Sequence, residues 1–377
     1  MYRLIKFTSI AIVALLTVSC NGGKVPATSE SGDTLRFKYS ELLSVVRYDD
    51  YTVANISDPW NKGEILHTYV LVPKGAATDH LPQGTIVSVP LTRSLPFTSV
   101  HSSLIINLGK QQSIAGVADL KYIKLPFIQQ QCANGTIADV GSALSPNIEK
   151  IIDTAPDALL ISPFENSGGY GKVSELGIPI IECADYMETS ALGRAEWMKF
   201  YGLLFGASRE ADSLFAIVDS CYTALKDMAS RMPKGRSVIM DKKTGSVWYV
   251  PGGHSTIGMM LSDANASYPF ASDMHSGSLS LPFETVLERA GNSDVWLFRY
   301  DSKHAITYKE LLSEYHGYSQ IQAFRNHQCY GCNVETSLFY EESPFRPDYH
   351  LNDIISIVHP DINGLDSLRY YKPLTGN

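Results

Sequence analysis

The chain has 377 residues, with 39 acidic against 31 basic side chains and a formal net charge of −8. Such an acidic balance, without a Lys/Arg cluster, argues against nucleic-acid binding and against a basic membrane-contact patch. Hydrophobic residues make up 44% of the sequence, which is ordinary for a globular protein with substantial cores. At about 150 residues per domain, the length predicts two domains.

The N-terminus is typical of an exported protein. Arg3 and Lys6 precede an apolar run from Phe7 to Val18. A helix rises about 1.5 Å per residue, so twelve residues cannot cross a hydrocarbon core about 30 Å thick. The pattern therefore predicts a signal peptide at residues 1–19 rather than a spanning helix.

Small residues before Cys20 resemble the lipobox of bacterial lipoproteins. The resemblance implies that Cys20 is lipidated and becomes the mature N-terminus, and ordinary cleavage near Ser19 is the alternative. Residues 20–36 are then the lipid anchor and a tether rich in Gly, Ser and Thr. Five cysteines follow Cys20, so in an oxidising compartment at least one thiol stays free.

Strand-like runs open each half of the chain. Residues 35–74 contain short β-like runs, which we interpret as an N-terminal extension of the first sheet. Thr85–Pro90 reads as a buried strand, and a helix opens at His101–Leu108. In the second half, Ser237–Met240 is strand-like, and His254–Leu261 parallels the first His-Ser segment.

A second correspondence joins the two halves more closely. Ser145–Ala155 precedes the strand Asp157–Ile161, and Ser280–Ala290 precedes Asp294–Phe298. Each segment has a Ser to cap a helix, a Pro in the first turn and a Glu four residues after the Ser. In each, an Asp starts the buried strand that follows. Apolar strands alternating with helices predict two similar α/β lobes with mainly parallel sheets.

One long helix is predicted at residues 207–232, between the lobes at 37–206 and 233–377. Ser208 can cap this helix, and apolar residues follow at spacings of three and four. A stiff connecting helix permits a few degrees of rocking but not wide hinge closure. We therefore expect only small ligand-driven motion.

In order and spacing, these segments resemble the helix-linked (cluster III) periplasmic binding proteins of ABC importers for ferric siderophores, haem and vitamin B12. The resemblance covers about residues 85–374. The segments that carry it are Ser145–Glu149, Pro156–Leu160, Leu176–Pro179, Trp197–Gly206, Pro282–Glu284 and Pro347–Pro360. It implies an α/β fold of two lobes joined by one long helix, with the ligand cleft between them.

The same resemblance implies a lipid-anchored periplasmic protein without enzymatic activity or cofactor. Its partners are then a metal-chelate small molecule, an ABC permease and its ATPase. In that family one glutamate on each lobe docks onto permease arginines, and the matching positions are Glu149 and Glu284. An exposed ion pair contributes about 0.2–1 kcal/mol, so this docking sets orientation more than affinity. The alternative is that both carboxylates only stabilise helix N-termini.

Ligands of open parallel sheets bind beyond the carboxyl ends of the strands, and aromatic and arginine side chains suit flat or anionic ligands. The residues nominated by this rule are Arg93, Ser94, His101, Phe164, Tyr170, Trp248, Tyr249, His254, Ser255, Arg299 and Tyr300. Trp248 with Tyr249, beside the Gly252–Gly253 turn, is the preferred set. Taken singly, each aromatic also fits a core position and each arginine a solvated surface.

Motifs of other functional classes do not match in their residue spacing, so the sequence predicts neither catalytic residues nor a metal site. The glycine-rich run 167–172 lacks the leading Gly and the final Ser/Thr of a phosphate loop. Cys329 and Cys332 are followed by Asn333, which excludes a c-type haem signature and leaves a local disulfide or two thiols. His327 nearby keeps a weak metal alternative. A cobalamin binder is the nearest competing function, followed by an anchored enzyme or a scaffold on the same fold.

Overall fold

The computed structural model of the chain describes residues 32–165 and 169–376. The predicted signal peptide at 1–19, Cys20 and most of the tether lie outside the described residues, as does part of the glycine-rich run. From Gly32 onward the chain packs as one compact unit, so the predicted lobe boundaries stay predictions. No helix of the described part has the length and apolar character needed to cross a membrane.

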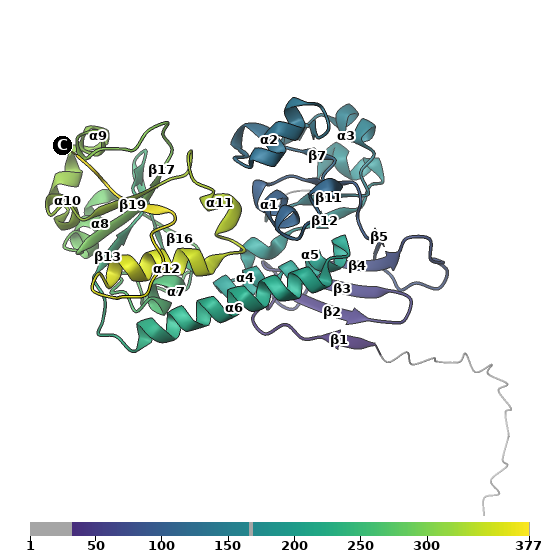
Figure 1. Cartoon of the computed structure of the whole chain (residues 1–377), viewed down its shortest axis with the longest axis horizontal. Coiled ribbons are helices and arrows are strands. Elements are labelled where there is room, and N and C mark those ends of the chain that lie inside the picture. Colours follow the sequence, from purple (N-terminus) through teal and green to yellow (C-terminus); the bar gives the residue numbers. More distant parts are fainter. Residues whose placement is uncertain (1–31, 166–168, 377) are drawn as a thin grey trace, which may run out of the picture. The chain divides into compact units, whose positions relative to one another are not determined.

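Five strands near the N-terminus form a sheet of their own, in the order β1-β2-β3-β4-β5 (Figure 1). They are β1 (Asp33–Leu35), β2 (Leu43–Arg47), β3 (Thr52–Ser57), β4 (Ile65–Pro73) and β5 (Thr85–Val89). Neighbours are antiparallel except β4 and β5, which are parallel. Residues 35–74 therefore extend the sheet that contains the predicted strand at Thr85, but this sheet is separate from the parallel sheet of the N-terminal lobe.

The strand β5 differs from its prediction in a second way. Val87 is buried, but the adjacent Ile86 is 42% exposed. Successive side chains of a strand point to opposite faces, so only one face of this edge strand packs on the core. The run Thr85–Pro90 is thus a half-buried edge strand, not a strand covered on both faces.

The parallel sheet of the N-terminal lobe consists of β6 (Ser94–Pro96), β11 (Ala158–Ile161) and β12 (Ile180–Glu182), in the order β12-β11-β6. Leu95, Leu159 and Leu160 have no exposed surface, as predicted for strands covered on both faces. The other elements of this lobe are α1 (Ser99–Asn107), η1 (Gln111–Ser113), β7 (Gly116–Val117), η2 (Leu120–Tyr122), α2 (Pro126–Ala133), β8 (Ala138–Asp139), β9 (Gly141–Ser142), β10 (Ser145–Pro146), α3 (Ile148–Thr154), η3 (Gly171–Leu176), η4 (Ala184–Met187), α4 (Ala191–Glu196) and α5 (Met198–Phe205).

The C-terminal lobe repeats this design around β13 (Val238–Met240), β17 (Val295–Tyr300) and β18 (Cys329–Asn333), which are parallel. The antiparallel β19 (Tyr371–Pro373) closes the sheet beside β18. The strands β14 (Lys243–Thr244), β15 (Val247–Pro251) and β16 (Ser278–Leu281) form a separate antiparallel sheet. The helices of this lobe are α7 (Thr256–Asp263), α8 (Phe283–Ala290), α9 (Tyr308–Glu314), η5 (His316–Gln320), α10 (Gln322–Arg325), α11 (Phe339–Glu342) and α12 (Pro347–Val358).

The similarity between the two lobes includes one hydrogen bond that occurs in both. In the N-terminal lobe, the Asp157 carboxylate accepts from the backbone N–H of Arg93, just before β6, at 3.0 Å. In the C-terminal lobe, Asp294 accepts from the N–H of Ser237, just before β13, at 2.8 Å. Each Asp thus ties the start of the middle strand to the start of its neighbour.

The predicted helix caps are wrong. Ser145 and Ser280 lie in β10 and β16, while the caps are Asn147 and Pro282. Asn147 accepts from the Lys150 N–H at 3.0 Å. A capping side chain must directly precede the helix to reach an N–H of its first turn, and both serines stand too far upstream.

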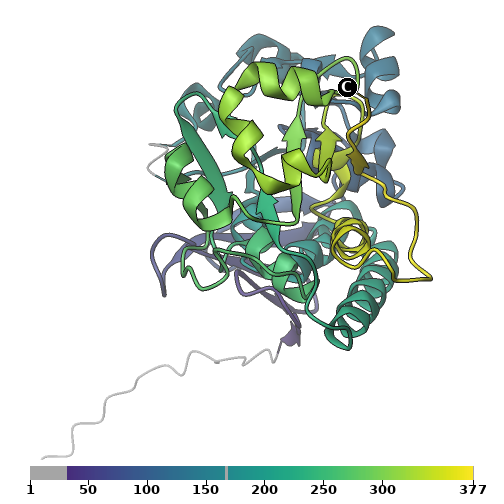
Figure 2. The ribbon, with the colours of Figure 1, turned by 90° about the vertical axis from the view of Figure 1, so that its left-hand side faces the viewer.

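The long helix α6 (Ser208–Ser230) has 23 residues and is therefore about 34 Å long. It packs against α5 on one lobe and against α12 and α7 on the other. Figure 1 shows it running beneath both lobes, and Figure 2 shows α6 and α12 side by side. Its cap is Ala207, so Ser208 is the first helical residue and not the cap. The predicted fold class, two α/β lobes joined by one long helix, is confirmed.

A second contact links the lobes directly, because α1 lies against α11. Phe345, which follows α11, is buried, and its ring meets those of Tyr201 and His101 edge to face. Nearby, Lys124 of the N-terminal lobe pairs with Glu335, which follows β18, at 2.5 Å. The carboxyl end of β18 therefore faces the N-terminal lobe.

Candidate functional site

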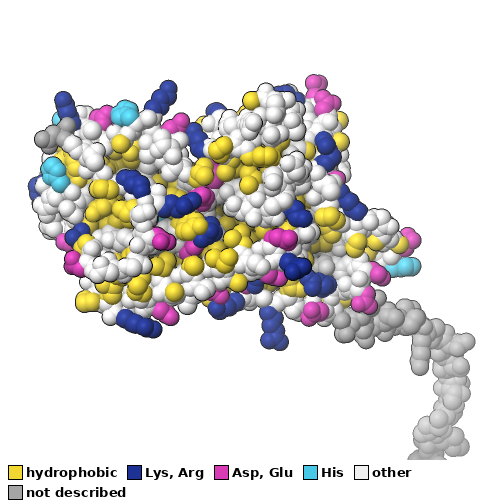
Figure 3. Space-filling view, in the orientation of Figure 1, with side chains coloured by type: hydrophobic (Ala, Val, Ile, Leu, Met, Phe, Trp, Pro, Cys, Tyr) yellow, Lys and Arg dark blue, Asp and Glu magenta, His cyan; other side chains and the backbone are white. Residues whose placement is uncertain are grey.

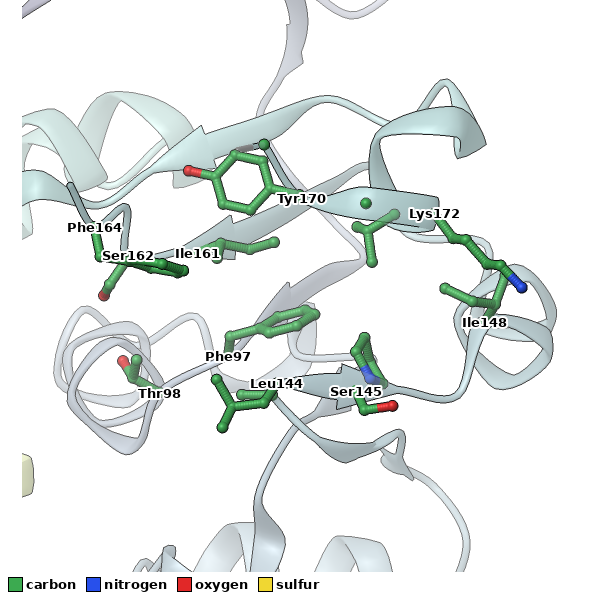
Figure 4. Close-up of a pocket in the computed structure, with 15 residues that line it drawn as sticks. Phe97, Thr98, Leu144, Ser145, Ile148, Ile161, Ser162, Phe164, Tyr170 and Lys172 are labelled. Atoms are coloured by element: carbon green, nitrogen blue, oxygen red, sulfur yellow. The ribbon is translucent and has the colours of Figure 1, made fainter. Parts of the chain in front are cut away.

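A cavity of about 530 Å³ opens at the carboxyl ends of β6 and β11 (Figure 4). It is lined by Phe97, Thr98, Ala143, Leu144, Ser145, Pro146, Ile148, Ile161, Ser162, Phe164, Gly169, Tyr170, Gly171, Lys172 and Val173. Phe97 and Thr98 directly follow β6, and Ile161 ends β11. The parallel pairing of these strands brings both segments to one edge of the sheet, where the predicted rule places ligands. We call this space the N-lobe cavity.

Apolar side chains dominate the N-lobe cavity. Phe97 belongs to a small buried cluster with Leu95 and Leu159, which forms the floor. At the rim, Phe164 is 56% exposed and Leu144 is 92% exposed. Two large apolar groups open to water at a concave site indicate a surface that a ligand covers.

Tyr170 is held in place by a partly buried carboxylate. Its hydroxyl donates to Glu182 Oε1 at 2.9 Å, and Glu182 ends β12. Burial and the neighbouring Glu182 raise the pKa of Tyr170 above its usual value, so the phenol stays neutral. Figure 4 shows the Tyr170 ring above Ile161, on the side of the cavity opposite Leu144. The ring is a fixed wall of the site.

Polar groups in the N-lobe cavity are few. Thr98, Ser145 and Ser162 bring hydroxyl groups, and Lys172 is the one charged side chain among the described lining residues. The site can therefore hold an apolar body with a small number of hydrogen bonds.

A second cavity of about 420 Å³ lies at the carboxyl ends of β13 and β17, and we call it the C-lobe cavity. Its lining residues are Lys242, Tyr300, Asp301, Ser302, His304, Ile306, Glu310, Ser313 and Glu314. Two ion pairs stand in it: Lys242 with Glu314, and His304 with Glu310 at 2.8 Å. The two cavities occupy equivalent edges of the two sheets.

The structure links the C-lobe cavity to the junction between the lobes. The N–H of Ser302 donates to Asn333 Oδ1 at 3.3 Å, and Asn333 ends β18. Two residues later, Glu335 pairs with Lys124 of the other lobe. Figure 3 shows the surface hollowed between the two lobes. The carboxyl ends of both sheets therefore adjoin one interlobe region.

Three of the predicted ligand residues line these cavities. Phe164 and Tyr170 line the N-lobe cavity, and Tyr300 lines the C-lobe cavity. All three stay predictions as ligand contacts. Phe97, Leu144 and Lys172 were missed. The run Ser94–Phe97 holds the signal for Phe97, because its short apolar strand leads into the α1 cap Thr98.

Arg93 and Ser94 are placed away from both cavities, which corrects their prediction. Their supposed strand, β5, belongs to another sheet, and β6 begins at Ser94, so both residues lie at its amino end. The Arg93 guanidinium donates to the Thr154 carbonyl, with Nε at 3.0 Å. Ser94 has no exposed surface and donates to the Ser113 carbonyl.

His101 supports the N-lobe cavity from behind and does not line it. It is buried, its Nδ1 lies 2.6 Å from Thr98 Oγ1, and its Nε2 lies 2.8 Å from Asp185 Oδ1. Burial opposes charge on the ring, but Cys183 and Asp185 outweigh it and raise the pKa of His101 to about 10. The charged ring thus positions Thr98, which does line the cavity.

The preferred pair, Trp248 and Tyr249, does not form one site. Trp248 has no exposed surface, donates to the Met240 carbonyl at 2.8 Å and packs against Trp296, so it is a core residue. Tyr249 is 48% exposed on the opposite face of β15 but lines neither cavity. Strand alternation separates the two rings.

The remaining predicted ligand residues either make structural contacts or lie outside both cavities. Ser255 is buried and caps α7 by accepting from the Gly258 N–H, and the adjacent His254 is exposed outside both cavities. Arg299 donates to both oxygens of Asp241, at 2.9 and 2.8 Å. A guanidinium paired in this way is not available to a ligand.

Glu149 and Glu284 are exposed in the first turns of α3 and α8, and their docking role stays a prediction. Cys329 and Cys332 are free thiols. Side chains three residues apart in a strand point to opposite faces, which rules out the local disulfide. Within the described residues no group of three or more His, Cys, Asp or Glu is arranged to hold a metal ion.

A family model described as periplasmic binding protein matches residues 100–335. Two uncharacterized lipoproteins of Methanocaldococcus jannaschii are similar to the chain. One is 26% identical over 358 residues, which is 88% of this chain and 84% of that protein. The other is 24% identical over 344 residues, which is 87% of this chain and 86% of that protein.

Solved structures share the fold. An ABC-type Fe³⁺-hydroxamate transport system from Saccharomonospora viridis superposes with a TM-score of 0.56 at 20% identity, covering 72% of this chain and 94% of that one. A periplasmic heme binding protein from Pseudomonas aeruginosa superposes with a TM-score of 0.57 at 15% identity, covering 76% of this chain and 100% of that one. At these identities the likeness extends to the fold alone.

Proposed function

This chain belongs to the periplasmic binding protein family, and we propose that it is the substrate-binding lipoprotein of an ABC importer. It captures a ferric chelate, either a siderophore or haem, between its lobes and delivers it to the permease. The alternative within the same class is a cobalamin binder. Enzymatic activity is not part of the proposal. Among the described lining residues the Thr98 hydroxyl does contact a histidine, His101, but the pKa of His101 is raised to about 10, so its ring is charged and cannot serve as a general base.

The observation that carries this proposal is the N-lobe cavity with its exposed Phe164 and Leu144. A chelate presents apolar and flat surfaces that such side chains can cover. The cavity lies at the strand ends, where ligands of open parallel sheets bind, and the C-lobe cavity occupies the equivalent edge of the other lobe. The structural neighbours described as Fe³⁺-hydroxamate and heme binding proteins support the same class.

Export and anchoring complete the proposal. Residues 1–19 direct export, Cys20 is lipidated, and the protein stays in the periplasm on a membrane. The two Methanocaldococcus jannaschii relatives described as lipoproteins support this location. Stable anchoring requires more than one acyl chain, which a lipidated N-terminal cysteine provides.

The test is direct binding by the soluble protein, residues 25–377 without the lipid. Purified protein is mixed with a ferric trihydroxamate, haem or cyanocobalamin, and coloured ligand that elutes with it from a gel-filtration column is measured. We expect one iron chelate to co-elute at a one-to-one ratio. Co-elution of the cobalamin alone would transfer the assignment to the alternative, and no co-elution with any of them contradicts the proposal.

A further inference from the structure

We propose that the ligand is a neutral or cationic chelate rather than a multiply anionic one. This inference rests on the proposed function and narrows its ligand class. Hydroxamate-type ferric complexes and neutral corrinoids meet the condition, whereas ferric tris-catecholates, which carry three negative charges, and haem with its two propionates do not.

The first argument is that neither of the two arginines predicted to contact the ligand, Arg93 and Arg299, can pair with an anionic ligand in the cavities. A multiply anionic ligand calls for guanidinium or ammonium groups that can pair with it in the site. Arg93 donates to the Thr154 carbonyl at the other edge of the sheet. Arg299 is paired through two hydrogen bonds with Asp241. Arg93 thus lies away from both cavities, and the charge of Arg299 is balanced by a carboxylate.

The N-lobe cavity itself offers little positive charge. Among its described lining residues only Lys172 is charged, and its polar partners are the hydroxyls of Thr98, Ser145 and Ser162. Lys124, at the interlobe junction, is neutralised by Glu335. Hydroxyl groups suit amide and carbonyl groups of a neutral ligand, and one ammonium cannot balance three negative charges.

The surroundings add negative potential. Three acids line the C-lobe cavity: Glu314 pairs with Lys242, Glu310 contacts His304, and Asp301 has no such partner among the described residues. Glu310 accepts from His304 and from Thr307, which lowers its pKa to about 2, so it is ionised near neutral pH. Asp301 is exposed and has neither a hydrogen bond nor an ion pair within the described part of the chain. We assign these acids no ligand contact, but their field repels anions approaching the interlobe region.

The experiment compares ferric complexes of different charge on the soluble protein. The probes are a cationic linear ferric trihydroxamate, a neutral cyclic one, an anionic ferric tris-catecholate, haem and cyanocobalamin. We expect a neutral or cationic probe to bind at least about tenfold more tightly than either anionic probe at low salt. The difference should shrink as salt screens the charges.

A matched pair of variants at one position separates the effect of added positive charge from the effect of a changed side-chain shape. Leu144 is almost fully exposed at the cavity rim, so Leu144→Lys and Leu144→Gln are both expected to fold. Leu144→Lys should reduce severalfold the ratio of the Kd for the tris-catecholate to the Kd for the neutral probe. Leu144→Gln should raise the Kd of every probe by the same factor, so that this ratio stays unchanged. Equal effects of the two changes on the ratio contradict the charge argument.

The outcomes separate the inference from the function on which it rests. Tightest binding of the tris-catecholate or of haem overturns the inference and leaves the importer function standing. Binding of cyanocobalamin alone supports the inference and selects the alternative ligand. Failure of every probe to bind overturns the proposed function itself.

Discussion

Burial decides the charge state of His350, which sits on α12 among aromatic rings. The rings of Phe339, Tyr370 and Tyr371 surround it, and its Nε2 has no hydrogen-bond partner among residues 32–165 and 169–376. Burial, and secondarily the Arg299 charge, lower the pKa of His350 to about 3. The folded protein therefore holds a neutral imidazole where the unfolded chain takes up a proton below about pH 6.5.

This difference predicts acid sensitivity. Because the folded pKa lies below the unfolded one, the stabilising contribution is complete above about pH 6.5 and is lost as the pH falls toward 3. Between pH 6.5 and 5 the loss amounts to about 2 kcal/mol. His350→Phe keeps a ring and removes the titration, so its urea midpoint should fall less between these pH values than that of the parent. The exposed His316→Gln is the control, and identical pH profiles for His350→Phe and the parent refute the assignment.

At the proposed ligand site, Phe164 is the residue whose exposure predicts the largest loss of binding. It is 56% exposed, so a bound ligand covers about half of the ring. Phe164→Ala should therefore cost about 1–1.5 kcal/mol of binding, or roughly a five- to tenfold higher Kd, with stability little changed. Met274→Ala removes an apolar side chain that is 71% exposed and lies outside both cavities, and it should leave the Kd unaltered. Equal Kd values for the two variants would exclude Phe164 from the site.

At the scale of elements, the segment between α11 and α12 locks the lobes together. Phe345 is buried against Tyr201 and His101 of the opposite lobe. Truncating a buried Phe to Ala costs about 3–5 kcal/mol, because a cavity remains. Phe345→Ala should lower the free energy of unfolding by this amount.

The same variant should also loosen the contact between α1 and α11, which faster amide hydrogen exchange in both helices would report. Tyr340→Ala, at a half-exposed neighbour, is the matched control. Unchanged exchange in α1 would mean that Phe345 contributes packing within its own lobe only. Together with α6, this contact favours the small ligand-driven motion expected from a stiff connection.

At the scale of the whole molecule, the proposed function requires that both lobes meet the permease at once. Glu149 and Glu284 are exposed at equivalent helix starts in the two lobes and are not among the cavity-lining residues, although Glu149 directly follows Ile148 of the N-lobe cavity. The double change Glu149→Ala with Glu284→Ala should leave the Kd for the ligand intact and abolish uptake by cells that carry the importer. Glu64→Ala, at an exposed glutamate directly before β4, should change neither. Uptake that survives the double change refutes the docking role.

The family resemblance and the main elements follow from sequence because they depend on local patterns. The long helix at α6 is visible in apolar spacing, and the paired segments before β11 and β17 repeat one order of residues. Strands that are continuously apolar, such as Leu159–Ile161, must be covered on both faces, which predicts a parallel sheet. These features need no knowledge of distant contacts.

The site was only partly predictable, because strand pairing and burial are set by residues far apart in the chain. Arg93 was misplaced since β5 pairs with β4 and leaves β6 to begin the parallel sheet. Trp248 and Tyr249 are neighbours in sequence, yet strand alternation sends one into the core and the other to the surface. The sequence by itself determined the two-lobed fold class and the connecting helix, and it predicts an export signal. Only tertiary structure decided which aromatics reach solvent and which arginines stay free, because both depend on partners supplied by other elements.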